Sequence, residues 1–157
     1  MGWALAFVLT YRLGESQLVK MAAPFLLDDS TAGGLEYSTE AVGTIYGTLG
    51  IIFLSAGGIL GGVLISRDGL GKWMLPMLLA LNLPNALYAL LAWTGADDLW
   101  AVGGTVMIEQ FGYGFGFAAF LVYLIYLAQG PYKTAHYALA TGFMALGMML
   151  PGMVSGW

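Results

Sequence analysis

The sequence predicts an all-α integral membrane protein with five transmembrane helices. Hydrophobic residues make up 59% of the 157-residue chain and charged residues only 9%, whereas a soluble domain carries about 25% charged residues. Transmembrane β-strands would be about half as long as the apolar segments seen here and would alternate in polarity. Five segments reach the ~20 residues that a helix needs to cross a bilayer: residues 2–27, 42–66, 73–94, 101–129 and 135–157.

The first segment differs from a cleavable signal peptide. It is too long, it has no basic region at its start, and it holds Arg12, Glu15 and Lys20 where a signal peptide has an apolar core. We therefore interpret residues 2–27 as a transmembrane helix.

The connectors between the segments are sorted by charge. Connectors 28–41 and 95–100 are acidic and hold no base, whereas the alternate connectors hold Arg67 with Lys72, and Lys133. Short loops rich in Lys and Arg stay on the cytoplasmic side. This pattern predicts a cytoplasmic start of the chain and an external position for the two acidic connectors.

Capping residues support the predicted helix boundaries. A side-chain oxygen or a negative charge near the free N–H groups of a helix start is stabilising. The candidates are Ser38, Thr39 and Glu40 for the second helix, Asp97 and Asp98 for the fourth, and Thr134 for the fifth. In the second helix, the small residues Gly57, Gly58, Gly61 and Gly62 favour close approach of another helix.

Polar residues in the first helix need an explanation, because ionisable groups inside a membrane are costly. Arg12 and Glu15 are spaced i, i+3 and Tyr11 and Glu15 i, i+4, which puts both pairs on one side of a helix. Gln17 and Lys20 add a second polar pair one turn on. Two interpretations stay open: an ion pair that only fixes packing, or an aqueous cavity where these groups meet a solute or protons.

Two more polar clusters occur in the third and fourth helices. Pro84 should bend the third helix, and Asn82 and Asn85 can bond freed carbonyls or a ligand. In the fourth helix, Glu109 and Gln110 precede three glycines. The helical-wheel neighbours of Glu109 are Thr105, Gly112, Tyr113 and Gly116, which predicts open space beside the carboxylate. The alternative is a protonated Glu109 that ties helices together.

Several other functions are disfavoured. The "GYGFG" stretch at 112–116 lies inside a long span, whereas potassium filters sit on short re-entrant loops. A dinucleotide loop needs a βαβ unit, which the chain does not predict. His136 alone is interpreted as an interfacial residue. We expect no enzyme activity, cofactor, metal site or nucleic-acid partner.

Four motifs resemble a known transporter family. "GGVLISRDGLGKW" at 61–73 is loosely similar to the loop motif of the major facilitator superfamily. The matching residues are Gly62, Arg67, Gly69 and Lys72, while Ser66 stands where Asp is usual and Leu70 and Gly71 where bases are usual. "YRLGES", "IEQFGYGFGFAAF" and "TAHYALATGFMALGMMLPGMVSGW" resemble, in order, segments of AmpG-type muropeptide permeases.

The resemblance implies a fold and a function. The five helices would be helices seven to eleven of twelve, so the chain is expected to be a partial C-terminal transmembrane domain, residues 1–157, of a six-helix half. The implied activity is proton-coupled import of anhydromuropeptides across the bacterial inner membrane for cell-wall recycling. Expected partners are lipid, a muropeptide-like solute, protons and a missing N-terminal half. Transport of an acyl-CoA or a sugar, and a non-transporting scaffold, remain alternatives.

The expected site follows from the polar residues and the resemblance together. Residues expected to bind solute or exchange protons are Arg12, Glu15, Asn82, Asn85, Glu109, Gln110 and Tyr113. Residues expected to act as conformational hinges are Pro84, Gly112, Gly114 and Gly116. The chain alone is expected to present the polar residues in one exposed groove.

Overall fold

The computed structural model describes residues 2–154, and this stretch is helical with no β-strand. The α-helices are α1 (Gly2–Thr10), α2 (Leu13–Leu27), α3 (Thr39–Thr44), α4 (Ile51–Asp68), α5 (Leu70–Asn82), α6 (Asn85–Thr94), α7 (Leu99–Leu127) and α8 (Lys133–Val154). A 3₁₀ turn, η1 (Ser30–Ala32), and a π-helix, η2 (Ile45–Gly50), complete the elements. Residues 155–157 of the fifth predicted helix lie outside the described part.

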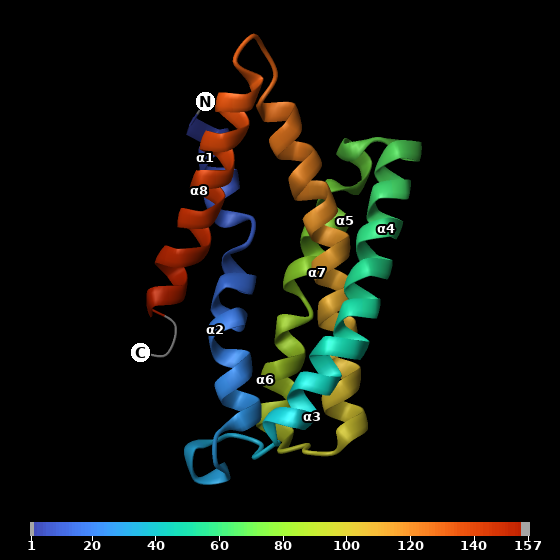
Figure 1. Cartoon of the computed structure of the whole chain (residues 1–157), viewed down its shortest axis with the longest axis vertical. Helices are drawn as coiled ribbons and strands as arrows, with labels where there is room; N and C mark the ends of the chain where they lie inside the picture. The colour runs from blue at the N-terminus through green and yellow to red at the C-terminus, as the bar shows by residue number, and fades with distance from the viewer. Residues whose placement is uncertain (1, 155–157) are drawn as a thin grey trace.

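The elements form five helical rods that run along the long axis of the molecule (Figure 1). The rods are α1 with α2, α3 with η2 and α4, α5 with α6, then α7, and α8. The most extensive packing joins α7 to α4 and α5, while α8 packs on α1 and α2. The α7 rod and the two rods that contain α4 and α5 therefore form one packed group, and α1, α2 and α8 form a second group beside it.

The predicted all-α membrane class is confirmed at this level. Three helical stretches are long and apolar enough to cross a membrane: Thr39–Asp68, Leu70–Thr94 and Leu99–Leu127. Large apolar side chains stay exposed on the outside of the rods, among them Ile59 at 70%. Such a surface suits lipid, which solvates apolar side chains at no cost. Tryptophans expose their rings near the rod ends, as in the aromatic belts of membrane proteins: Trp3, Trp93 and Trp100.

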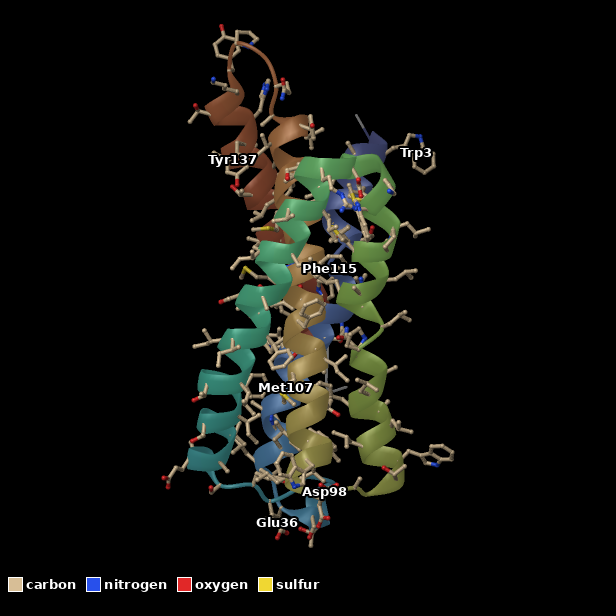
Figure 2. All side chains as sticks on the ribbon, turned by 90° about the vertical axis from the view of Figure 1, so that its right-hand side faces the viewer. Trp3, Glu36, Asp98, Met107, Phe115 and Tyr137 are labelled. Carbon is tan, nitrogen blue, oxygen red and sulfur yellow. The ribbon has the colours of Figure 1, made fainter. Side chains whose placement is uncertain are left out.

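The charge-sorted connectors lie at opposite ends of the molecule. Glu36 and Asp98 come together at the lower end, and Trp3 and Tyr137 mark the other end (Figure 2). The turn at Gly69, between α4 and α5, also lies at the upper end (Figure 1). The predicted separation of acidic and basic connectors is therefore confirmed, while the side that faces the cytoplasm stays a prediction.

Two of the three predicted caps are confirmed. The Ser38 side chain accepts a hydrogen bond from the Ala41 N–H at 3.1 Å. Asp98 accepts bonds from the N–H groups of two residues in the first turn of α7. The cap expected at Thr134 is wrong, because α8 begins one residue earlier, at Lys133. Thr134 thus lies inside the helix.

Two of the predicted helices are interrupted. The segment 2–27, expected as one helix, breaks at Tyr11 and Arg12 between α1 and α2, which is a correction. The third predicted helix breaks at Leu83 and Pro84, between α5 and α6, where a bend was predicted. Proline supplies no N–H to the helix ladder, so the second break follows directly from the sequence.

The glycines of α4 have the packing role predicted for them. A Cβ on Gly57 would strike the Phe111 carbonyl of α7, and a Cβ on Gly61 would lie 3.0 Å from the Phe115 carbonyl. Gly58 is in ordinary contact with α7, whereas nothing lies near Gly62. Backbone-to-backbone contact of this kind lets helices pack closely in lipid, where apolar side chains alone give little preference for association.

Candidate functional site

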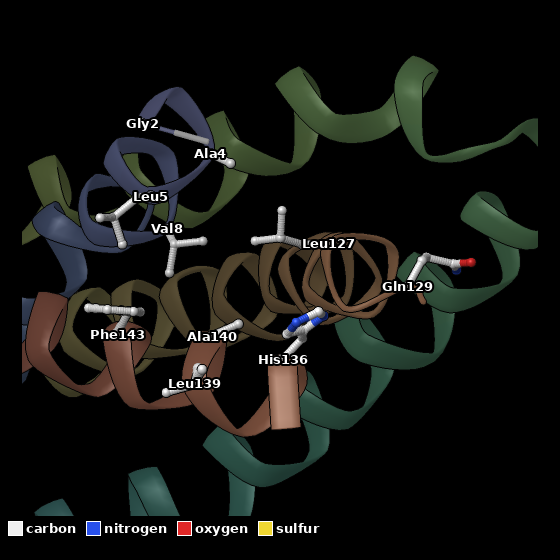
Figure 3. A pocket seen from close by; sticks show the side chains of 10 residues that line it. All are labelled: Gly2, Ala4, Leu5, Val8, Leu127, Gln129, His136, Leu139, Ala140 and Phe143. Atoms are coloured by element: carbon white, nitrogen blue, oxygen red, sulfur yellow. The ribbon is translucent and has the colours of Figure 1, made fainter. Parts of the chain in front are cut away.

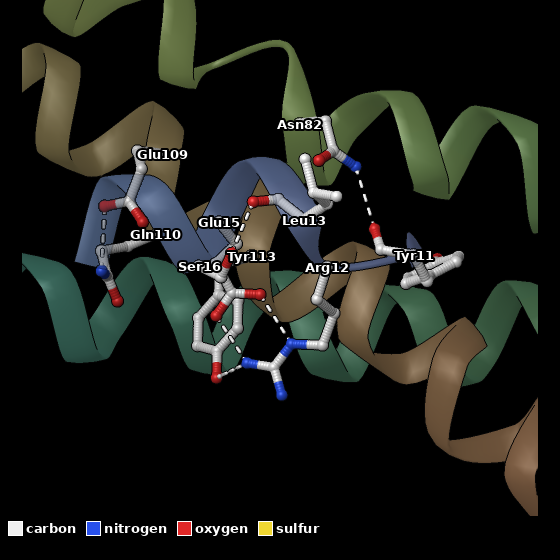
Figure 4. Close-up of polar contacts among 9 residues, drawn as sticks. All are labelled: Tyr11, Arg12, Leu13, Glu15, Ser16, Asn82, Glu109, Gln110 and Tyr113. Carbon is white, nitrogen blue, oxygen red and sulfur yellow. Dashed lines mark hydrogen bonds and ion pairs between the residues drawn. The ribbon is translucent and has the colours of Figure 1, made fainter. Parts of the chain in front are cut away.

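The break between α1 and α2 is the starting point of the site. It leaves backbone carbonyls without helical partners, and inside a membrane each of these needs another donor. Asn82 Nδ2 donates to the Tyr11 carbonyl at 3.3 Å and to the Leu78 carbonyl at 2.9 Å. The amide on one interrupted rod thus bonds the freed backbone of another (Figure 4).

Tyr11 anchors the break to α7. Its hydroxyl donates to the Gly116 carbonyl at 2.9 Å, and its ring stacks on Phe120 with 4.7 Å between centroids. The side chain is buried. The expected placement of Tyr11 beside Glu15 is therefore wrong, because the helix does not continue between them.

Arg12 and Glu15 form a buried ion pair, as their spacing predicts. Arg12 Nε donates to one carboxylate oxygen at 2.7 Å, and Nη2 donates to the other at 2.5 Å. Nη2 also donates to the Tyr113 hydroxyl at 3.0 Å, and the guanidinium carbon lies 4.7 Å from the Phe117 ring centroid. Two charge-assisted bonds and an aromatic face thus replace water around the cation.

Glu109 is buried without a cation. Only 7% of the residue is exposed, and its carboxylate accepts a hydrogen bond from Gln110 Nε2 at 2.9 Å. Among the described residues, no Lys, Arg or His lies within ion-pair distance of it. The nearby charge of Glu15 has the same sign. The two carboxylates of the site therefore differ: Glu15 is neutralised by Arg12, and Glu109 is not.

The open space expected beside Glu109 is absent at its glycine neighbours. A Cβ on Gly112 would collide with the Ala80 carbonyl of α5, and one on Gly116 would lie 2.5 Å from the Met77 carbonyl. Both glycines therefore serve close contact between α7 and α5. This corrects the prediction from the helical wheel. A helical wheel shows which residues share a face of one helix, but it does not show which other helix covers that face.

The glycines that follow Glu109 in α7 pack against two different helices. Gly112 and Gly116 face α5, while a Cβ on Gly114 would meet the Leu54 carbonyl of α4. The helix itself continues without a break from Leu99 to Leu127. The predicted hinge role of these glycines stays a prediction, and their packing role is now defined.

Asn85 contributes a donor that the rest of the described chain does not use. Its Nδ2 atom is buried and has no hydrogen-bond partner within residues 2–154. It lies on the first turn of α6 and faces Gly14, where an added Cβ would come within 3.0 Å of Nδ2 and 2.6 Å of Asn82 Oδ1. Buried amide donors are rarely left unpaired, so the Asn85 donor is an unusual feature of the described chain.

Three of the polar residues expected in an exposed groove are buried instead, which corrects the prediction for these three. Arg12, Glu15 and Glu109 are 7%, 4% and 7% exposed. The α1–α2 rod and α7 bring them together inside the chain (Figure 4). Gln17 instead donates to the Pro151 carbonyl of α8 at 2.9 Å, and Lys20 is exposed on α2.

The loop between α4 and α5 centres on a residue that sequence reasoning missed. Asp68 accepts hydrogen bonds from Arg67 at 3.0 and 3.1 Å, from Lys72 at 3.3 Å and from Trp73 at 3.0 Å. Gly69 follows in a left-handed conformation with φ of 86°, which favours glycine. The sequence signal that could have predicted these bonds is an acid with basic residues one position before it and four positions after it, Arg67 and Lys72.

A second missed feature is a pair of tyrosine hydroxyls. Tyr46, in η2, and Tyr88, in α6, place their hydroxyl oxygens 2.5 Å apart. The two residues are 42 positions apart in the chain. No local sequence pattern relates them, so only the packing of the helices could reveal the pair.

His136 borders a separate, mostly apolar cavity. This cavity of about 540 Å³ lies between α1, the end of α7 and α8, and its polar side chains are Gln129 and His136 (Figure 3). None of the predicted site residues lines it. Within residues 2–154, no group of three or more His, Cys, Asp or Glu residues could hold a metal ion.

Fold and site together define a multi-pass helical membrane protein with a buried polar cluster between packed rods. Comparison with known proteins narrows this class. The chain is 28% identical over 153 residues to the anhydromuropeptide permease of Escherichia coli (strain K12). The aligned residues make up 98% of this chain and 30% of that protein. The chain is also 25% identical to "Putative transporter AmpG 3" of Rickettsia prowazekii (strain Madrid E), and this alignment includes 97% of this chain and 34% of that protein.

The resemblance to AmpG-type permeases is thereby confirmed along nearly the whole chain. The chain spans about a third of the length of these relatives. These relatives are named as a permease and as a putative transporter. No family model and no solved structure matches the chain.

Proposed function

We propose that the chain forms part of a proton-coupled importer of anhydromuropeptides in the bacterial inner membrane. The similarity to AmpG-type permeases supports the transport class, and the buried polar cluster supports a site within the helices. We further propose that these helices belong to a major-facilitator half, the partial C-terminal domain predicted from the sequence, and that a second helical half covers the site from the other side.

One observation carries the proton coupling: the site holds two carboxylates with different partners. Glu15 receives two hydrogen bonds from Arg12, so its negative charge is compensated. Within residues 2–154, the hydrogen bond assigned to the Glu109 carboxylate comes from the neutral Gln110 amide. A carboxyl group buried without a cation is more stable as the neutral acid. Glu109 is therefore the group we assign to proton binding.

Solute binding falls to the remaining polar groups. The buried Asn85 donor, which has no partner among the described residues, suits a carbonyl oxygen of a sugar or peptide. Arg12 retains Nη1, to which no hydrogen bond is assigned within residues 2–154, while Nε and Nη2 hold Glu15 and Tyr113. In this proposal Arg12 meets an anionic group of the solute through Nη1.

The proposal is tested by reconstituting the protein that the native gene encodes in vesicles and measuring transport. Labelled GlcNAc-anhydromuramyl peptide should accumulate when the outside is more acidic than the inside, and a protonophore should abolish accumulation. Glu109→Gln should remove the dependence on the pH gradient, because the amide cannot bind and release a proton. The exposed Glu40→Gln is the matched control and should transport like the unaltered protein.

Each alternative has its own result. Competition by an acyl-CoA or a sugar, but not by unlabelled anhydromuropeptide, would identify another solute. Uptake that ignores the pH gradient would refute proton coupling. Unchanged uptake in both Glu109→Gln and Arg12→Ala would refute the site assignment.

A further inference from the structure

The Tyr46–Tyr88 pair is a hydrogen bond between hydroxyls in an otherwise apolar part of the molecule. Tyr88 is buried among Leu18 and Ala22 of α2. Tyr46 packs against the cluster of Ile45, Leu91 and Val106 from three different rods. Tyr88 therefore lies where α6 packs against α2, with Tyr46 beside it, and the separation of 2.5 Å between the two hydroxyl oxygens permits a proton to shift between them.

The pair lies on the outer side of Glu109. The acidic connectors mark the predicted external end of α6, at Thr94, and of α7, at Leu99. At about 1.5 Å of rise per residue, Tyr88 lies roughly 9 Å from that end and Glu109 roughly 15 Å. The order along the membrane normal is thus outer face, tyrosine pair, Glu109.

The element that carries Tyr46 is unusual and touches the same site. Ile45–Gly50 forms a π-helix within an otherwise α-helical rod, and such insertions are often found at functional sites. At its end, a Cβ on Gly50 would lie 3.4 Å from Gln110 Cγ, and Gln110 is the residue that donates to Glu109. The π-helix therefore packs against Gln110, the hydrogen-bond partner of Glu109, and the same π-helix carries Tyr46, which meets Tyr88.

We propose that Tyr46 and Tyr88 form a hydroxyl relay that carries protons between the outer face and Glu109. The inference rests on the proposed function, in which Glu109 binds the coupling proton. An external hydronium ion gives its proton to the Tyr46 oxygen, the Tyr46 proton passes to the Tyr88 oxygen, and the Tyr88 proton reaches Glu109 through a bridging water. Each O–H bond that breaks is matched by one that forms. The products are water, two neutral tyrosines and a neutral Glu109.

The other ionisable groups around Glu109 do not offer the same route. Glu15 of α2 is held by Arg12, and the hydroxyl of Tyr113 of α7 accepts a bond from Arg12. These three residues lie on the side of Glu109 away from the acidic end, since α2 runs from Leu13 toward Leu27 at that end. Tyr46 and Tyr88 therefore face Glu109 from the side on which external protons arrive.

Infrared spectroscopy after an acid jump tests the relay without any solute. The protein from its native gene is placed in vesicles, and the external pH is lowered rapidly. The C=O band of protonated Glu109 is assigned by its loss in Glu109→Gln. The rate at which this band appears should fall at least about tenfold in Tyr46→Phe and in Tyr88→Phe, because each loses one hydroxyl of the relay. Tyr126→Phe, an exposed tyrosine of α7, should match the unaltered protein.

The outcomes separate the relay from the proposed function. If the band appears at the unaltered rate in both Tyr→Phe variants, the relay is wrong and proton binding by Glu109 stands. If only the final amplitude of the band changes, the pair merely ties η2 to α6, and the relay is again wrong. If the unaltered protein shows no Glu109 band at any pH, proton binding by Glu109 fails and the relay fails with it.

Discussion

The Arg12 guanidinium donates two hydrogen bonds, of 2.7 and 2.5 Å, to the Glu15 carboxylate. The two residues lie about one helical turn apart at the start of α2. Both residues are buried, and Arg12 stands at the break that separates α1 from α2. The pair therefore places a compensated charge at an irregular point of the backbone, next to the uncompensated Glu109.

Removing one member of this pair should destabilise the protein more than removing both. Arg12→Leu leaves Glu15 buried without a cation and should lower the free energy of unfolding by about 3–5 kcal/mol. The double variant Arg12→Leu, Glu15→Leu should lose clearly less, because no uncompensated charge remains. Unfolding in detergent, arranged as a double-mutant cycle, measures the coupling. Additive losses would show that the two charges do not depend on each other.

The glycine contact between α7 and α5 should be sensitive to a single methyl group. Gly112→Ala places a Cβ against the Ala80 carbonyl, and such overpacking should cost about 1–3 kcal/mol of stability. Gly104→Ala on the same helix is the matched control, because nothing lies within 4 Å of its Cβ position. Thermal unfolding of both variants tests this expectation. Equal melting temperatures would contradict the packing role of Gly112.

Asn82 and Asn85 should respond differently to the same substitution. Asn82→Ala leaves the Tyr11 and Leu78 carbonyls without their donor, which should cost about 1–3 kcal/mol. Asn85→Ala removes an amide whose Nδ2 atom has no partner in the described part of the chain, so it should change stability little. In the proposed transporter, Asn85→Ala should instead weaken solute affinity. Unfolding and solute-binding measurements on both variants separate the two roles, and a larger stability loss in Asn85→Ala would contradict them.

The predicted orientation can be tested with single cysteines, since the chain contains none. Thr31→Cys lies in the acidic connector and should react with a membrane-impermeant maleimide added to intact spheroplasts. Gly71→Cys lies at the opposite end, near the basic loop, and should react only after lysis. Both positions are exposed, so differences in labelling report the side of the membrane. The reverse pattern would invert the assigned topology.

Local features of the site could be predicted because they depend on neighbours within one helix. The Arg12–Glu15 pair follows from i, i+3 spacing, the break near Pro84 from a missing N–H, and the Ser38 and Asp98 caps from their side-chain oxygens. Each of these involves at most one or two helical turns. The break at Tyr11 and Arg12 escaped prediction because no proline or glycine occupies either position.

Contacts between helices could not be predicted from one sequence. The wheel placed Gly112 and Gly116 beside Glu109 but did not show that carbonyls of α5 lie against them. The same limit applies to the Tyr46–Tyr88 hydrogen bond, whose partners belong to different rods. Such contacts depend on the rotation of each helix about its axis and on its position along the membrane normal. Hydrophobic periodicity specifies neither quantity for a helix that is apolar on most sides.

By itself, the sequence determined the helical membrane class, the separation of acidic and basic connectors and the ion pair of Arg12 with Glu15, because composition and local spacing suffice for each. Three further features depend on the packing of the helices: no cation of the described residues pairs with Glu109, Asn82 bonds the interrupted backbone, and Tyr46 meets Tyr88. The physical reason is that a buried polar group takes its properties from whichever helix packs against it, and that neighbour is chosen by backbone-to-backbone contact at glycines distant in the chain.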